Sequence, residues 1–289
     1  MNNLSNQIQT LAPDDPLFPE SLKKIKSPPK VLYFIGNLEL KNKFLFAVVG
    51  TRTPSDYGKK VVIDFVKTLT EAGFVIVSGL AKGIDALAHK TCLDYEGKTI
   101  AVLGSGLDKV YPKENLRLAK EIIQKQGALV SEYPPSTSPC HFHFPERNRI
   151  IAGLSQGVLV IEAREKSGAL ITADWAFLQK KPVFAIPGSI YNETSKGCHI
   201  LIKKGAKLAS SPKEILQFFG ISFKQRKRVI EGTDEEKLIF QLLLDKTLHV
   251  DEIIQLSKLE ASKVLQTISK MELEGKIKNL GGNIFTAIS

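Results

Sequence analysis

From residue 44 onward, short apolar runs alternate with amphipathic stretches. Six nearly continuous apolar runs of four to seven residues begin at residues 44, 74, 99, 128, 157 and 182. Strands that are buried on both faces have this pattern, and such strands belong to parallel sheets. The intervening stretches carry apolar residues at helical spacing and end at glycines such as Gly73, Gly97 and Gly127. This alternation predicts a doubly wound, mostly parallel α/β sheet with right-handed crossovers.

The same pattern divides the chain into four segments. Residues 1–43 are rich in proline and poorly periodic, which indicates an N-terminal extension or cap. Residues 44–220 form the predicted sheet domain, and the polar, basic stretch 221–233 is typical of a linker. Residues 234–289 contain three amphipathic helical patterns and then two strand-like runs around Gly281 and Gly282, a hairpin signal. This order predicts a small winged-helix-like domain.

Charge separates the two predicted domains. The chain has a net charge of +10, of which residues 1–220 carry +9. Such a balance favours phosphate polymers or anionic lipid surfaces as partners, although it is also compatible with solubility alone. In the third C-terminal helical pattern, Lys263 and Lys270 are offset by Glu272 and Glu274. We therefore interpret this domain as a protein-interaction or regulatory module, and the basic cluster of residues 224–228 as a solvated hinge.

The sequence offers no sign of a membrane or an oxidising compartment. No apolar run approaches the roughly 20 residues that span a bilayer, and the N-terminus lacks the pattern of a signal peptide. The three cysteines, Cys92, Cys140 and Cys198, lie far apart in the sequence and cannot pair completely. We therefore expect a cytoplasmic protein with no membrane contact.

Glycine-containing polar turns follow the predicted strands. The carboxyl ends of parallel strands meet at one edge of a sheet, where ligands bind. Small residues there let backbone N–H groups approach an anion, and the following helix N-terminus favours negative charge. Any one glycine is explained by a tight turn, but several basic turns together favour a chain of phosphates. The turn residues expected to contact such a chain are Gly50, Thr51, Arg52, Ser55, Lys82, Gly83, Lys166 and Gly168.

A long segment after the fourth run, residues 134–153, mixes aromatic and basic residues, and we expect it to be a loop. Rings that stack on bases, interleaved with cations that meet phosphates, are typical of single-strand binders. One of the two phenylalanines, Phe142 and Phe144, is expected to pack against the core instead. The residues expected to contact single-stranded DNA here are His141, Phe144, Arg147, Asn148 and Arg149.

Catalytic, metal and cofactor signals are weak. The chain has no phosphate-binding P-loop and no Gly-x-Ser-x-Gly elbow. The acids Asp85, Asp108, Glu132 and Glu162 are scattered, and Cys140 and the nearby histidines have no second pair at zinc-finger spacing. We therefore expect no catalytic residues, no metal and no cofactor.

With these motifs assembled, the sequence resembles the DNA-processing protein A (DprA/Smf) family. The matching strings are Val49 to Ser55 with Tyr57 and Gly58, Ser78 to Asp85, Gly104 to Asp108, Tyr111 with Pro112, and Asn115. They continue with Phe144 to Ser155, which is highly specific, and then with Glu162, Ala163, Ser167 to Ala173, Pro187 and Gly188. The match covers roughly residues 15–215, and the C-terminal piece resembles the winged helix that many members carry.

The resemblance implies an extended Rossmann-type fold, binding of single-stranded DNA, homodimerisation, and loading of the RecA recombinase onto incoming strands. It points to Arg52 for a phosphate contact and to Phe144 for contact with a base. His141 stands where some members have a basic residue, which weakens that contact or makes it pH-dependent. We expect the 43 residues before the sheet domain to be too few for the helical domain that many members have there.

Two other functions compete with single-strand binding. Related Rossmann-like proteins hydrolyse nucleoside monophosphates through a Pro-Gly-Gly-x-Gly-Thr turn, but the corresponding stretch here runs Lys166, Ser167, Gly168, Ala169, Leu170. A transcription regulator acting through the C-terminal domain is the second alternative, and the near-neutral charge of that domain opposes it. The sequence therefore favours a non-enzymatic single-strand binder acting in DNA uptake or recombination.

Overall fold

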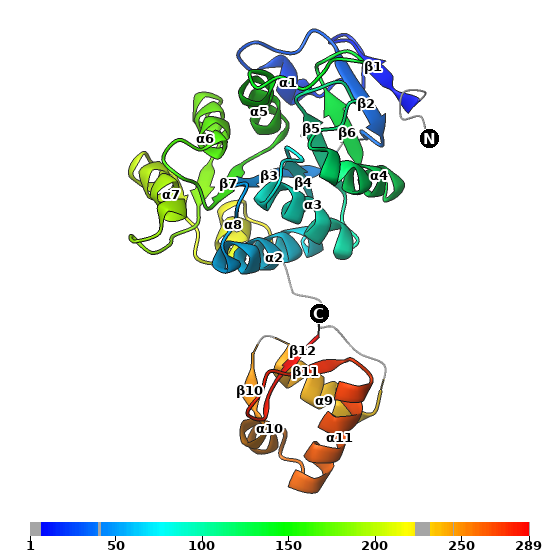
Figure 1. Cartoon of the computed structure of the whole chain (residues 1–289), viewed down its shortest axis with the longest axis vertical. Coiled ribbons are helices and arrows are strands. Elements are labelled where there is room, and N and C mark those ends of the chain that lie inside the picture. Colours follow the sequence, from blue (N-terminus) through cyan, green and yellow to red (C-terminus); the bar gives the residue numbers. More distant parts are fainter. Residues whose placement is uncertain (1–6, 40–41, 223–231, 245, 289) are drawn as a thin grey trace. The chain divides into compact units, whose positions relative to one another are not determined.

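The computed structural model describes residues 7–39, 42–222, 232–244 and 246–288, which divide into two compact units, Met1–Lys224 and Gln225–Ser289. Figure 1 shows both units, and each is described here by itself. The predicted linker falls mostly outside the described residues, as does its basic cluster Lys224, Arg226, Lys227 and Arg228. None of the described helices is both long enough and apolar enough to cross a membrane.

The larger unit is built on one nine-stranded sheet with the order β1-β2-β6-β5-β4-β3-β7-β8-β9. Seven strands are parallel, and six of them coincide with the predicted apolar runs. These seven are β3 (Phe44–Gly50), β4 (Phe74–Ser78), β5 (Thr99–Leu103), β6 (Ala128–Ser131), β7 (Val158–Ile161), β8 (Val183–Ala185) and β9 (Lys207–Leu208). The prediction of a doubly wound, mostly parallel sheet is therefore confirmed.

Helices cover both faces of the sheet (Figure 1) because successive strand residues point to opposite sides. Residues such as Leu45 and Ala47 pack with one set of helices, and Phe46 and Val48 pack with the other. The first set is α1 (Glu20–Lys23), α5 (His143–Leu154), α6 (Gly168–Leu178) and α7 (Glu193–Lys203). The second set is α2 (Asp56–Glu71), α3 (Ile84–Asp94), α4 (Leu116–Gln124) and α8 (Pro212–Phe218).

The order of the strands places a switch point beside β3. From β3 the chain moves through β4, β5 and β6 in one direction, and it then returns to add β7 on the other side of β3. The turns that follow β3 and β7 therefore lead away from each other. In open α/β sheets this divergence leaves a crevice at the carboxyl ends of the two strands.

Part of the N-terminal segment belongs to the sheet itself. β1 (Gln9–Leu11) and β2 (Leu32–Gly36) pair antiparallel, and β2 pairs antiparallel with β6. Between them, α1 packs on α5, where Leu22 lies so close to Gly153 that a side chain there would meet it. Residues 9–36 therefore extend the sheet and support α5 from outside.

The prediction of a loop over residues 134–153 is wrong in its second half, because α5 begins at His143. Pro145 lies in the first turn, where its missing N–H has no intrahelical partner to lose. Residues 147–154 are all buried, so they show no polar stripe at helical spacing. Because the helix is buried on all sides from Arg147 onward, it has no amphipathic periodicity there, and the sequence therefore resembles a loop.

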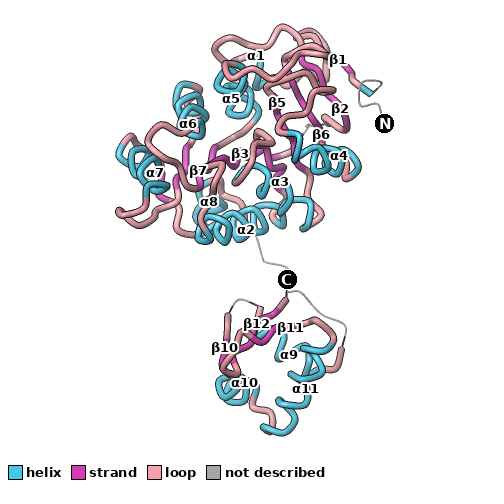
Figure 2. Tube along the Cα trace, in the orientation of Figure 1, coloured by secondary structure: helices cyan, strands magenta, loops and turns pink. Residues whose placement is uncertain are grey.

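The smaller unit is a winged helix, as predicted. Figure 2 shows its helices and its small sheet, whose strand order is β10-β12-β11. Its core joins Ile239, Ile253, Val264 and Met271 from the three helices with Phe285 from the hairpin. The elements are α9 (Asp234–Leu243), β10 (Leu248–His249), α10 (Val250–Ser257), α11 (Ala261–Leu273), β11 (Ile277–Asn279) and β12 (Ile284–Ala287).

Candidate nucleic-acid interface

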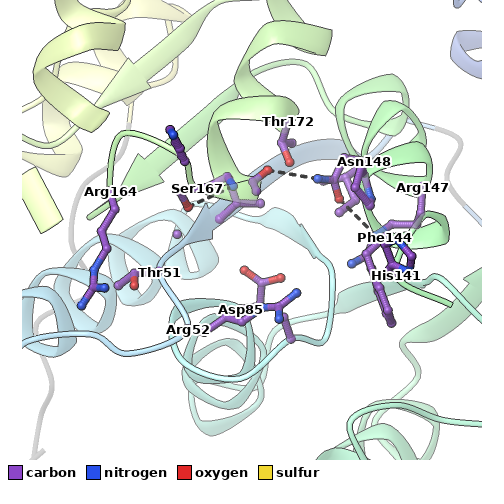
Figure 3. A pocket seen from close by; sticks show the side chains of 18 of the residues that line it. Thr51, Arg52, Asp85, His141, Phe144, Arg147, Asn148, Arg164, Ser167 and Thr172 are labelled. Atoms are coloured by element: carbon purple, nitrogen blue, oxygen red, sulfur yellow. Dashed lines mark hydrogen bonds between the residues drawn. The ribbon is translucent and has the colours of Figure 1, made fainter. Parts of the chain in front are cut away.

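A crevice of about 630 Å³ opens at the switch point, between the turns after β3 and β7 and the N-terminal ends of α5 and α6. Figure 3 shows Arg52 and Arg164 projecting from the two turns, with Phe144 on the opposite wall. The polar and aromatic residues of its lining include Thr51, Arg52, Asp85, Tyr111, His141, Phe144, Arg147, Asn148, Arg164, Lys166, Ser167 and Thr172.

The turn between β3 and α2 is held by a buried carboxylate. Glu162 accepts hydrogen bonds from the backbone N of Ser55 (2.8 Å) and from its hydroxyl (2.5 Å), and from the hydroxyl of Thr194 (3.0 Å). Its backbone oxygen accepts from the N–H of Thr51 at 2.8 Å. These bonds fix the turn in one conformation, so that Arg52 is exposed and held at the edge of the crevice.

Two glycines make this turn possible. A Cβ on Gly50 would lie 2.0 Å from the carbonyl oxygen of Ile161, because β3 and β7 approach closely there. Gly83 has φ +79°, and a Cβ on it would lie 2.4 Å from the carbonyl oxygen of Thr51. Gly83 therefore supports the Arg52 turn from behind, and the N–H of Ile84 donates to Thr51 at 3.1 Å.

A buried arginine forms the floor of the crevice. The guanidinium of Arg147 donates to the carbonyl oxygens of Gly79 (2.7 Å) and Val102, and the side chain is 4% exposed. Asp85 lies nearby and accepts from the N–H of Gly79 at 3.1 Å. Burial lowers the pKa of Arg147 to about 10, although Asp85 opposes that change. Burial likewise raises the pKa of Asp85, against the opposing effect of Arg147.

The start of α6 presents an anion-binding end to the crevice. The hydroxyl of Ser167 caps the helix by accepting from the N–H of Ala169 at 3.3 Å, and no atom would obstruct a side chain at Gly168. Asn148 donates to the carbonyl oxygen of Gly168 at 3.1 Å and so ties α5 to α6. Helix N-termini favour negative charge.

Three exposed cations surround this helix end. Arg52 comes from the turn after β3, and Arg164 and Lys166 come from the turn after β7. Within the described residues, none of the three takes part in an ion pair. Their charges are therefore available to a ligand.

The aromatic residues divide between packing and exposure. Phe144 is half-buried, covers Gly104, and contacts Tyr111 with ring centroids 5.5 Å apart. Phe142 is 70% exposed and lies beside the ring of His141, at 3.6 Å between centroids. The ring of Phe144 therefore combines the packing expected of one phenylalanine with an edge on the crevice.

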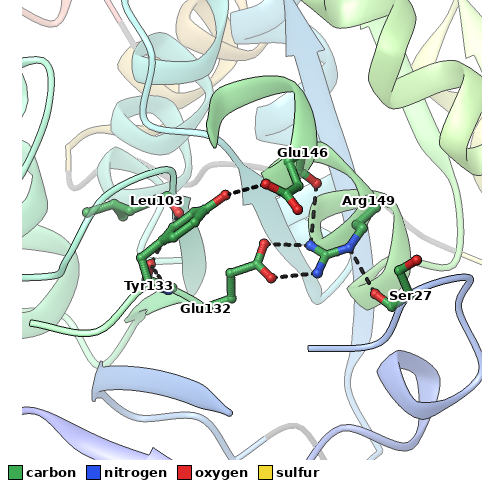
Figure 4. Close-up of polar contacts among 7 residues, drawn as sticks. Ser27, Leu103, Glu132, Tyr133, Glu146 and Arg149 are labelled. Atoms are coloured by element: carbon green, nitrogen blue, oxygen red, sulfur yellow. Dashed lines mark hydrogen bonds and ion pairs between the residues drawn. The ribbon is translucent and has the colours of Figure 1, made fainter. Parts of the chain in front are cut away.

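Arg149 faces away from the crevice and anchors α5. Its guanidinium forms a bidentate ion pair with the carboxylate of Glu132, with N···O distances of 2.6 and 2.5 Å. Its Nε donates to the carbonyl oxygen of Ser27 at 2.9 Å. Figure 4 shows this network beside the hydrogen bond between Tyr133 and Glu146. Burial, with Glu132 nearby, raises the pKa of Tyr133, so its hydroxyl stays protonated.

The structure brings nine of the thirteen expected DNA-contact residues to the crevice. They are Gly50, Thr51, Arg52, His141, Phe144, Arg147, Asn148, Lys166 and Gly168. Of the other four, Ser55 binds Glu162, Gly83 supports the turn, Arg149 pairs with Glu132, and Lys82 lines a small adjacent hollow.

Among the basic and aromatic residues that line the crevice, two are absent from the expected DNA contacts, Arg164 and Tyr111. Arg164 follows the fifth apolar run, only two residues before Lys166, so its position was the available signal. Tyr111 lies in the segment after β5, and the spacing of residues in the sequence does not indicate that this segment reaches the crevice. In the described part of the chain, no group of three or more His, Cys, Asp or Glu side chains could hold a metal ion.

Comparison with protein families gives two matches along the chain. The model of DNA recombination-mediator protein A matches residues 9–220, and that of the DprA winged helix domain matches residues 226–283. The chain belongs to the DprA family. The resemblance carried by the turn motifs and by the Phe144 to Ser155 string is therefore confirmed.

Individual DprA proteins agree with this assignment. The DNA processing protein DprA of Streptococcus pneumoniae is 49% identical over 205 residues, which cover 71% of this chain and 72% of that protein. Its crystal structure superimposes with a TM-score of 0.69, covering 76% of this chain and 77% of the other. The chain spans about half the length of the Smf proteins of Escherichia coli and Synechocystis, at 54% of each.

A second solved structure comes from another relative. It is DNA processing protein A from Helicobacter pylori, which is 32% identical, with a TM-score of 0.67, covering 74% of this chain and 95% of that one. The structure of that DprA was described for its mode of binding single-stranded DNA.

Proposed function

We propose that this DprA-family chain binds single-stranded DNA in the switch-point crevice, with no reaction of its own. The observation that carries the proposal is the meeting of three exposed cations, a helix N-terminus and an aromatic ring in one hollow. The single-strand binding described for the Helicobacter pylori relative supports the same function.

In this proposal each group of the crevice has a separate task. A phosphate at the start of α6 would meet the N–H groups there, together with the side chains of Lys166 and Arg164. The next phosphate would meet Arg52, while Phe144 would contact a base that is not stacked in a duplex. Arg147 is buried and donates to two carbonyl oxygens and to Asn148, so it would contribute positive potential from the floor rather than a mobile contact.

Salt dependence tests the polymer contact. The logarithm of the affinity for oligo-dT should fall with the logarithm of salt concentration, with a slope of about −0.7 for each phosphate contacted. Arg52→Glu should weaken binding roughly 10- to 100-fold, because it removes one charge-assisted contact and adds repulsion. Arg117→Glu is the matched control, since Arg117 is an exposed arginine of α4 that does not line the crevice. A flat salt response, or equal effects of the two variants, would refute the proposal.

The wider role that we propose is protection of incoming DNA and delivery of the RecA recombinase during transformation or recombination, by a cytoplasmic homodimer. Family membership supports this role. It is tested by adding the chain to single strands coated with a single-strand binding protein and measuring recombinase filament formation, and by sedimentation of the free chain. Release of free bases from nucleoside monophosphates would instead support the enzymatic alternative.

A further inference from the structure

A small hollow of about 50 Å³ extends the crevice past Phe144. It shares Arg52, Tyr111, Phe144 and Arg147 with the crevice and adds Lys82 to its lining. The two hollows are therefore neighbours with shared walls, and a path from one to the other runs across the two contacting rings. Lys82 lies at the far end of this path, where its ammonium group pairs with Glu114 at 2.6 Å.

Tyr111 is an exposed aromatic residue that lines both hollows. The residue is 47% exposed, although its ring contacts that of Phe144. The two rings are tilted by 42° with centroids 5.5 Å apart, so they touch directly and leave no room for a base between them. Each ring instead presents a separate outer surface, and exposed rings flanked by cations are the usual platforms for unpaired bases.

We propose that Tyr111 is a second base-stacking platform, which receives the nucleotide next to the one that contacts Phe144. The phosphate between these nucleotides lies between Arg52 and Lys82, and it displaces Glu114 from Lys82. The displacement is easy because the Lys82–Glu114 pair is exposed on both sides and such pairs are weak. The inference rests on the proposed single-strand function and specifies the route of the strand beyond the crevice.

The test separates base contacts from phosphate contacts. Affinity is measured for oligo-dT and for an abasic strand of the same length, and the ratio of the two dissociation constants reports base stacking alone. Tyr111→Ala should reduce the affinity for oligo-dT by about 5- to 150-fold, leave the abasic affinity unchanged, and so shrink the ratio. Tyr111→Phe should keep the ratio because the ring remains. Tyr57→Ala is the matched control, since Tyr57 is also 47% exposed but lines neither hollow.

A double variant excludes a purely supporting role for Tyr111. If Tyr111 only held Phe144 in place, Phe144→Ala combined with Tyr111→Ala would bind as weakly as Phe144→Ala alone. Two platforms predict that the double variant loses clearly more affinity than either single variant. Glu114→Gln should strengthen binding, since it frees Lys82.

The outcomes are distinct. Wild-type binding with an unchanged base-to-abasic ratio in Tyr111→Ala would overturn the platform and leave the crevice function intact. Absence of oligonucleotide binding by the wild type would overturn both.

Discussion

Burial determines whether Arg52, Arg147 and Arg149 can contact a ligand. Arg52 is exposed at the edge of the crevice. Arg147, in contrast, is 4% exposed and donates hydrogen bonds to the carbonyl oxygens of Gly79 and Val102. Arg149 is also buried, and a carboxylate holds it. A guanidinium that is buried and held by several hydrogen bonds cannot follow a flexible ligand. In the proposed function, contact with the strand would therefore fall to the exposed cations, while the buried arginines keep the walls in place.

The cysteines give a residue-scale test that needs no substitution at the crevice. Cys92 and Cys198 are buried, and burial raises the pKa of each to about 11, so neither thiol is reactive at neutral pH. Cys140 is partly exposed, between the crevice residues Pro139 and His141. A thiol reagent should label one cysteine in the native protein and three in denaturant.

Single-stranded DNA should slow the native labelling several-fold, because a strand in the crevice covers Cys140. Mass spectrometry identifies the labelled cysteine, and Cys140→Ser is the control that should lose the fast phase. Labelling that is indifferent to saturating oligonucleotide would place the strand elsewhere.

At the scale of elements, α5 joins the crevice to the rest of the larger unit. Its first turn carries Phe144, and the next turn sends Arg147 toward β4 and β5 and Arg149 toward Glu132 and the N-terminal segment. Because these bonds fix the helix on two sides, the position of Phe144 depends on contacts far from the crevice. The N-terminal segment is thus part of the support of the crevice.

The Arg149–Glu132 pair should be costly to break. Arg149→Met leaves the largely buried Glu132 without its partner, and we expect the free energy of unfolding to fall by about 3–5 kcal/mol. Lys204→Met, which breaks the exposed pair with Asp174, is the control and should cost less than about 1 kcal/mol. Urea unfolding followed by the fluorescence of Trp175, the one tryptophan of the chain, reports on the larger unit. Equal effects of the two variants would contradict this account.

The sequence predicts elements well where periodicity or turn chemistry is strong. The six apolar runs mark β3 to β8 because strands covered on both faces leave a continuous apolar signal. Helix α5 is not predicted because residues 147–154 are buried on all sides and so show no alternation between apolar and polar faces. At the crevice, sequence identifies Arg52 and Lys166 as turn residues. It cannot tell that Arg149 turns away, because that depends on a carboxylate 17 positions earlier.

At the scale of the whole molecule, the chain separates a basic sheet unit from a nearly neutral winged helix. In the latter, Lys263 and Lys270 of α11 are paired with Glu235 and Glu236 of α9. A helix that enters a DNA groove needs its cations for phosphates. Here both cations already have carboxylate partners, which together with the near-neutral charge agrees with the interpretation of this unit as a module for protein contacts.

Removal of the winged helix tests this division of labour. A chain that ends at residue 224 should bind oligo-dT within about twofold of the full chain, because the net positive charge and the crevice both lie in the retained part. The measurement is a pair of titrations at the same salt concentration, together with one on duplex DNA. A large loss of single-strand affinity, or duplex binding that disappears with the deletion, would assign DNA contact to the C-terminal unit.

The exposed pair between Lys82 and Glu114 has a consequence for how the protein responds to its ionic surroundings. Added salt screens the attraction of Lys82 for a phosphate, but it screens the competing attraction of Glu114 to a similar degree. The two effects oppose each other, so the net attraction of Lys82 for a phosphate changes little with salt concentration. An increase in ionic strength would therefore weaken the proposed contact with the strand first at Lys166 and Arg164. The contact at Lys82, which is paired with Glu114, would weaken last.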